Sequence, residues 1–250
     1  MKKKYFLNQL TWKEFDTQIN DILILPVGAT EQHGYHLPLS TDSIIAEQIA
    51  LQLAQKVNGI VAPTISYGYK SNPASGGGPL FKGTIDLGGI TLINLVRDIL
   101  EEFCKDGVTK IFVNNAHFEN QAFILEAISI VSEDYPHVQI LTSNWWDVLS
   151  DDVISKLFDT VPFKGWALEH AALTETSLIM YLAPEMVYAE HMLYNEEMTP
   201  VPYQKYPIVP GMVPSSGVLA SVEGATADKG KLIVDFAVEK FAQIIQSEFK

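Results

Sequence analysis

Two segments of the sequence each carry an acidic residue and a histidine two positions apart. Glu31 and His33 form the first pair, and His117 and Glu119 form the second. This spacing in an extended segment points both side chains to the same side, so each segment can offer a carboxylate and an imidazole to one point. Asp42 follows the first pair at the predicted start of a helix, where it could alternatively serve only as a helix cap.

These five side chains form a recognisable set of metal ligands. Each one alone has an ordinary interpretation as a solvated or capping residue. Together they offer carboxylates and imidazoles but no thiolate, which suits divalent ions such as zinc or manganese. A single catalytic zinc usually takes about three protein ligands, so the larger set favours two ions bridged by a carboxylate. The sequence therefore predicts a two-metal hydrolase site.

The predicted secondary structure brings both pairs to one edge of a sheet. Apolar runs predict strands at 22–28, 59–68, 108–115 and 138–146. Apolar residues at helical spacing predict helices from Thr41 or Asp42 to 57, from Thr91 to 107, and over 120–133, 175–187 and about 228–249. Strands that alternate with helices predict an α/β fold, a three-layer sandwich with a mostly parallel sheet flanked by helices. In such sheets reactive groups gather at the carboxyl ends of the strands.

The bulk properties narrow the classes of partner and location. We expect a single domain over 1–250, with a proline-rich surface loop excursion at 192–218. A net charge of −13 argues against a nucleic-acid partner, and no apolar stretch is long enough to suggest a membrane partner. Cys104 is the single cysteine and cannot form an internal disulfide, so we expect a cytoplasmic location. It lies in the apolar pattern of a predicted helix, so we expect it to pack in the core.

Longer stretches around these residues resemble the creatininase (creatinine amidohydrolase) family. The stretches that carry the resemblance are LPVGATEQHGYHLPLSTD (25–42), YGYKSNPASGGG (67–78), FKGT (81–84), NNAHFEN (114–120), NWWDV (144–148) and GWALEHAALTETS (165–177). They extend over nearly the whole chain. They are most similar to the members of the family that hydrolyse creatinine to creatine, so the resemblance implies a small-molecule amide substrate and a homohexameric assembly.

The resemblance also implies how the metal ions are held. Glu31, Asp42 and His117 would hold one ion, often manganese. His33, Asp42 and Glu119 would hold the other, zinc, so that Asp42 bridges the two. In such a site the ions activate a water molecule for attack on the amide carbonyl.

Further positions are implied to contact the substrate or take part in catalysis. The substrate-binding positions are Ser75, Phe118, Trp146, Trp166, Ala167 and Glu169. The two tryptophans would stack on the flat creatinine ring, and Glu169 would accept hydrogen bonds from its exocyclic nitrogens. His170 would protonate the ring nitrogen that leaves, and Glu119 is the second implied catalytic residue. We expect Trp145 to be a core residue.

Three positions depart from the family pattern and leave the substrate open. Phe118 stands where a tyrosine is expected, Ala167 where an acidic residue is expected, and Leu80 where a histidine is expected. None is a predicted metal ligand, so the hydrolase prediction is unaffected. The alternatives are hydrolysis of another small cyclic or formyl amide, and a metal-binding homologue without catalysis.

Overall fold

A parallel sheet forms the centre of the computed structural model, which describes residues 3–76, 78–199 and 201–249. The strands within these residues are β1 (Leu23–Val27), β2 (Ile60–Val61), β3 (Lys110–Asn115) and β4 (Gln139–Asn144), in the order β2-β1-β3-β4. Every pairing is parallel, and Val27 at the end of β1 pairs with Asn115 at the end of β3. The predicted α/β class is therefore confirmed, and the two strands that precede the acid–histidine pairs are neighbours.

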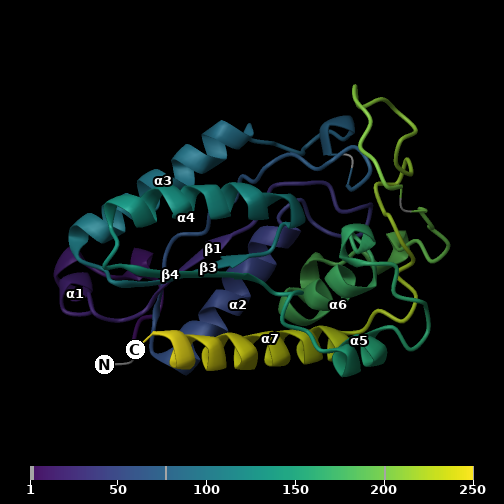
Figure 1. The fold of residues 1–250 in the computed structure, drawn as a ribbon. Helices are drawn as coiled ribbons and strands as arrows, with labels where there is room; N and C mark the ends of the chain where they lie inside the picture. The colour runs from purple at the N-terminus through teal and green to yellow at the C-terminus, as the bar shows by residue number, and fades with distance from the viewer. Residues whose placement is uncertain (1–2, 77, 200, 250) are drawn as a thin grey trace.

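Helices cover both faces of this sheet (Figure 1). The α-helices of the described residues are α1 (Trp12–Asp16), α2 (Thr41–Val57), α3 (Gly89–Asp106), α4 (Gln121–Asp134), α5 (Asp151–Leu157), α6 (Leu173–Leu182) and α7 (Ala227–Glu248). Short 3-10 helices lie at Leu7–Gln9, Gly78–Leu80, Phe118–Asn120, Trp166–Leu168, Pro184–Met186 and Ala189–His191. Helices α3 and α4 lie on one side of the sheet, and α2, α6 and α7 lie on the other.

The alternation of side chains along β1 explains the three layers. All of β1 is buried, as expected for a parallel strand covered on both faces. Leu23 and Leu25 pack with residues of α3 and α4, whereas Ile24 packs with residues of α2 and α7. Full burial of one such side chain stabilises the fold by about 1.5–3 kcal/mol. Cys104 packs in the core beneath α3, as predicted.

Some element bounds differ from the sequence prediction for identifiable reasons. Strand β2 has only two residues because the chain soon reaches Pro63, which has no N–H to donate to a neighbouring strand. Helix α6 ends at Leu182, before Pro184, and continues only as a 3-10 turn. Helices α1 and α5 were not predicted, because five and seven residues are too short to show a helical period.

The segment that follows the 3-10 turn Ala189–His191 is irregular. Its described parts, 192–199 and 201–218, contain no helix or strand. Side chains from 195 to 209 are mostly exposed in those parts, whereas Val213 and Val218 are buried. Within the described residues, no helix combines the length and the apolar character needed to cross a membrane.

Candidate metal and substrate site

The predicted ligands meet at the carboxyl ends of β1 and β3. Glu31 and His33 follow β1, His117 follows β3, and Asp42 lies in the first turn of α2. All four are at least 96% buried. Burial of charged groups is costly unless they are paired or bind a metal, so their convergence indicates a dedicated site.

Asp42 lies between the two imidazoles of the cluster. Its Oδ1 is 3.0 Å from His33 Nε2, and its Oδ2 is 3.0 Å from His117 Nδ1. The same His117 nitrogen is 3.3 Å from Glu31 Oε2. One carboxylate oxygen therefore faces each histidine, which is the arrangement that a bridging ligand requires.

Gly28 permits this close approach of β1 and α2. A Cβ atom on Gly28 would lie 2.6 Å from the backbone of Ser43 and 2.8 Å from that of Asp42. Real Cβ atoms do not approach backbone atoms so closely, so any side chain here would force strand and helix apart. Ser43 also donates a hydrogen bond of 3.0 Å to the carbonyl of Ala29, which ties the two elements together.

The tautomers of His33 and His117 leave one nitrogen of each free to bind an ion. His33 Nδ1 is 3.1 Å from the carbonyl of Glu31, and His117 Nε2 is 2.8 Å from the carbonyl of Tyr69. A carbonyl oxygen only accepts, so each of these nitrogens carries the hydrogen. The opposite nitrogens, His33 Nε2 and His117 Nδ1, face the carboxylates, as in metal sites where a second hydrogen bond orients the ligand.

The residues present fit a cation between them. His33 Nε2 and Asp42 Oδ2 are buried without a hydrogen-bond partner among the described residues, although His33 Nε2 lies 3.0 Å from Asp42 Oδ1 and Asp42 Oδ2 lies 3.0 Å from His117 Nδ1. In the described part of the chain, three groups of side chains lie close enough to share an ion: Glu31–Asp42–His117, Glu31–His33–His170 and His33–Asp42–Glu175. The first is the predicted manganese set, and the third contains two members of the predicted zinc set.

The carboxylates of Glu119 and Glu175 occupy different sides of the cluster. Glu119 lies 3.6 Å from His117 Nε2, on the side away from Asp42, and accepts a hydrogen bond from Ser75. Among the described residues, Glu119 is not in a group that lies close enough to share an ion with His33, so its predicted role as a ligand stays a prediction. Glu175, in the first turn of α6, lies 3.4 Å from His33 Nε2. Glu175 was not among the ligands predicted from the sequence.

Burial and charge pairing shift the pKa values of the cluster in opposite directions. Burial opposes ionisation of Glu31, but His170, His117 and His33 outweigh it and lower the pKa to about 2. Burial also opposes charge on His33, yet Asp42 and Glu175 raise its pKa well above the ordinary value. The carboxylates thus favour positive charge at this place, which a bound cation could supply instead of protons on the imidazoles.

A pocket opens over this cluster. It is lined by all the predicted substrate-binding residues, namely Ser75, Phe118, Trp146, Trp166, Ala167 and Glu169. Phe118 and Trp146 lie with ring centroids 5.8 Å apart and ring planes 33° apart. The structure therefore brings the aromatic residues and the metal cluster to one cavity.

The neighbours of the pocket explain the remaining sequence expectations. Trp145 is 2% exposed and packs edge-on against both Trp146 and Trp166, which agrees with its predicted role in the core, although it also reaches the pocket wall. Leu80 packs in a small apolar cluster with Leu168 and Val213.

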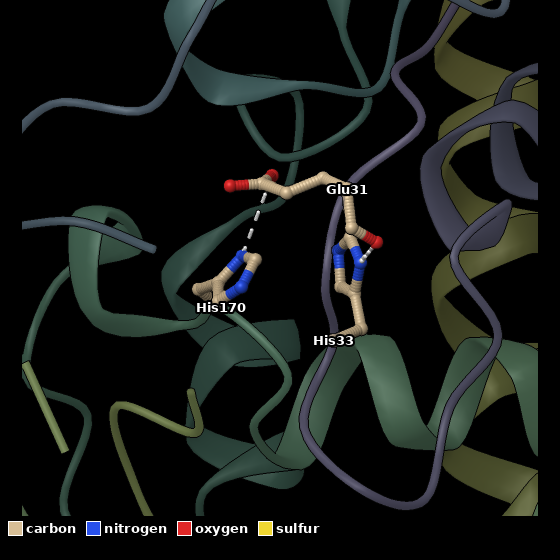
Figure 2. A group of neighbouring side chains, drawn as sticks. All are labelled: Glu31, His33 and His170. Atoms are coloured by element: carbon tan, nitrogen blue, oxygen red, sulfur yellow. Dashed lines mark hydrogen bonds and ion pairs between the residues drawn. The ribbon is translucent and has the colours of Figure 1, made fainter. Parts of the chain in front are cut away.

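Glu169 and His170 line the pocket with altered acidity. Burial raises the pKa of Glu169 to about 7, against the opposing effect of two hydrogen bonds from Thr174. Burial lowers the pKa of His170, although Glu31 acts in the other direction. Figure 2 shows the His170 ring directed at the Glu31 carboxylate, with Nδ1 3.8 Å from Oε2, beside the His33 ring.

A buried metal-ligand cluster at the strand ends of an α/β sandwich, beneath a small pocket, defines the class of metal-dependent hydrolases. Comparison with known proteins narrows the class. The family model described as "Creatininase: Creatinine amidohydrolase" matches residues 8–245. This chain belongs to the creatininase family.

Similar proteins match along the full length. The chain is 34% identical to creatinine amidohydrolase of Pseudomonas putida, over 100% of this chain and 99% of that protein. A structure described as a mutant creatininase of Zn-Zn type superposes with a TM-score of 0.95 at 34% identity, over 99% of each chain. A creatininase described as the Mn form gives a TM-score of 0.94 with the same identity and coverage. These forms and the ligand cluster together support divalent metal ions as the cofactors.

Proposed function

We propose that this protein hydrolyses creatinine to creatine by opening its cyclic amide at a site that holds two divalent ions. The observation that carries the proposal is the position of Asp42, which faces two imidazoles, one of which, His117, lines the aromatic pocket. The full-length similarity to a creatinine amidohydrolase supports the same substrate. Two bound ions would lower the pKa of water to provide a nucleophile and would polarise the carbonyl.

We assign the ions to the ligand sets implied by the sequence. Manganese would lie with Glu31, Asp42 and His117, which the structure brings together. Zinc would lie with His33, Asp42 and Glu119. The carboxylate of Glu175 stands next to His33 and offers a further acceptor on that side of the cluster.

The residues of the pocket would bind and orient the substrate. Trp146 and Trp166 line the pocket and would stack on a planar, guanidinium-like heterocycle. Glu169 would accept hydrogen bonds from the exocyclic nitrogens, and its pKa of about 7 means that it is largely ionised only above neutrality. His170 would donate to the ring nitrogen that leaves, and Ser75 would fix the position of Glu119 and the substrate.

A second candidate function is hydrolysis of another small cyclic or formyl amide. The observation that favours it is the lining of the pocket by Phe118 and Ala167, which offer no side-chain polar group. The chain is also similar to a protein with another described activity, a mycofactocin precursor peptide peptidase of Mycobacterium tuberculosis, at 28% identity over 88% of this chain and 84% of that protein.

The deciding experiment is a turnover assay with defined metal content. The protein is stripped with a chelator, reloaded with manganese, zinc or both, and tested for creatine formation from creatinine and for cleavage of a panel of cyclic and formyl amides. Creatine formation that depends on reloading supports the proposal. Turnover of another amide alone would favour the second function, and full metal loading without turnover of any amide would indicate a binding protein.

We further propose a homohexamer, on the basis of the resemblance alone, and a cytoplasmic location, on the basis of the single cysteine. Light scattering after size-exclusion chromatography would measure the mass in solution, and a monomeric mass at assay concentrations would refute the assembly. Cell fractionation would test the location.

A further inference from the structure

Gln32 lies between the two metal-ligand residues Glu31 and His33, but its side chain points elsewhere. Its Oε1 accepts a hydrogen bond of 2.9 Å from the backbone N–H of Gly34. Its Nε2 lies 2.9 Å from the carbonyl oxygens of both Gly76 and Gly217. Because carbonyl oxygens only accept and the Gly34 N–H only donates, these contacts determine which end of the amide is nitrogen.

The same amide nitrogen lies 2.7 Å from His170 Nε2. An amide nitrogen has no lone pair to accept with, so a hydrogen on His170 Nε2 would have no partner and would meet an N–H group. The amide has two hydrogens for three acceptors, so the two carbonyls and His170 Nε2 share them, and His170 Nε2 accepts in this contact. In a neutral imidazole the hydrogen must then be on Nδ1, which faces the Glu31 carboxylate across the pocket (Figure 2).

His170 thus differs from the two histidines of the metal cluster. His33 and His117 give their N–H to backbone carbonyls and turn a bare nitrogen toward the carboxylates. His170 does the reverse, since its bare nitrogen faces Gln32 and its N–H faces the cluster. A nitrogen that carries a hydrogen cannot bind a metal ion, although Glu31, His33 and His170 are close enough to share one.

We propose that Gln32 is a positioning residue that holds His170 as the Nδ1–H tautomer, so that His170 acts as a hydrogen-bond donor to the substrate and not as a metal ligand. This inference rests on the proposed function for the identity of the acceptor, the leaving ring nitrogen. The Nδ1–H would stabilise the charge that develops on this nitrogen and would supply the proton that the nitrogen needs when the C–N bond breaks.

The surroundings hold Gln32 in this orientation. A Cβ atom on Gly217 would lie 1.9 Å from Gln32 Oε1, so only glycine leaves room for the amide. Gly76 and Gly217 belong to two segments that lie more than one hundred residues apart in the chain. Gln32 therefore links the position of His170 to both segments.

The tautomer can be read directly by nitrogen NMR on chelator-treated protein labelled with 15N-histidine, with His170 identified by its absence in His170→Ala. We expect a protonated Nδ1 and an unprotonated Nε2 for His170 in the wild type. In Gln32→Met, which keeps the bulk and removes the donor, we expect the Nε2–H form to become populated. A wild-type spectrum with Nε2 protonated, or an unchanged spectrum in Gln32→Met, would overturn the proposal.

Kinetics provide a second readout. With both ions bound, Gln32→Met should lower kcat by about 10–100-fold, the usual scale for a residue that orients another, with KM changed much less. Gln55→Met, on the exposed face of α2, is the matched control and should leave both values unchanged. A kcat within twofold of wild type would overturn the proposal. If the wild type fails to turn over creatinine, the proposed function fails, and the NMR spectra still decide the role of Gln32.

Discussion

Replacement of Glu169 by glutamine should make the protein more stable at alkaline pH. The carboxyl is 6% exposed, and burial raises its pKa from 4.5 to about 7. The folded protein therefore keeps a proton on Glu169 at pH values where the unfolded chain has lost it. Because the unfolded state then binds fewer protons, the free energy of unfolding falls as pH rises through this range. Below the pKa of Glu169 in the unfolded chain both states keep the proton, so this loss of stability is absent.

The expected change in the free energy of unfolding follows from the size of the pKa shift of Glu169. A difference of roughly two and a half pKa units corresponds to about 3 kcal/mol in full, of which about 2 kcal/mol falls between about pH 5.5 and pH 8.5. Glutamine has nearly the same shape and can still accept both hydrogen bonds from Thr174 through its carbonyl oxygen. Glu169→Gln should therefore gain about 2 kcal/mol relative to wild type between those two pH values.

Urea unfolding of both chelator-treated proteins at each pH, at one protein concentration, measures the difference. The concentration must be matched because assembly would add to the apparent stability. The control is Glu223→Gln, an exposed glutamate, whose stability relative to wild type should not depend on pH. If the difference between Glu169→Gln and wild type is the same at both pH values, the argument that burial controls this carboxyl is wrong.

Three further predictions concern the metal and substrate site. Asp42→Ala should lose most of the bound metal, measured by elemental analysis, because Asp42 faces both imidazoles. The control is Asp228→Ala, which changes an exposed acid in the first turn of α7 and should keep about two ions per chain. Full metal content in Asp42→Ala would mean that Asp42 is only a helix cap. His170→Ala should keep both ions and lose about 10²–10⁴-fold in turnover, and activity within a few-fold of wild type would exclude it from the mechanism. Phe118→Tyr should raise creatinine turnover by up to about tenfold, the value of one polar contact, and no gain in a protein inactive on creatinine would point to another amide.

The central features of the fold and the metal site could be predicted from the sequence. The apolar runs 22–28 and 108–115 indicated parallel strands, and the polar pairs that follow them lie at the ends of neighbouring strands in the structure. Asp42 could be included because a helix start after the first strand places it at the same edge. These inferences depend on local pattern and on one rule of α/β topology.

Other residues could not be found in this way. Glu175 joins the cluster through the packing of α6, which no local pattern specifies. The role of Gln32 depends on contacts with Gly76, His170 and Gly217, which are distant in the chain. The orientation of Glu119 depends on its contacts with Ser75 and His117, so its position in the sequence did not determine which side of the cluster it would face.

The contact made possible by Gly28 has a consequence for how such a site can be lost. Helix α2 runs as one rigid rod from Thr41 to Val57, so a methyl group at position 28 would tilt or shift its whole first turn and carry Asp42 away from Glu31. The ligands would all remain in the sequence, yet ion affinity would fall because the distance between them had changed. A family member can therefore become metal-free through a single change at a residue with no functional group, and an inventory of ligands would still classify it as active.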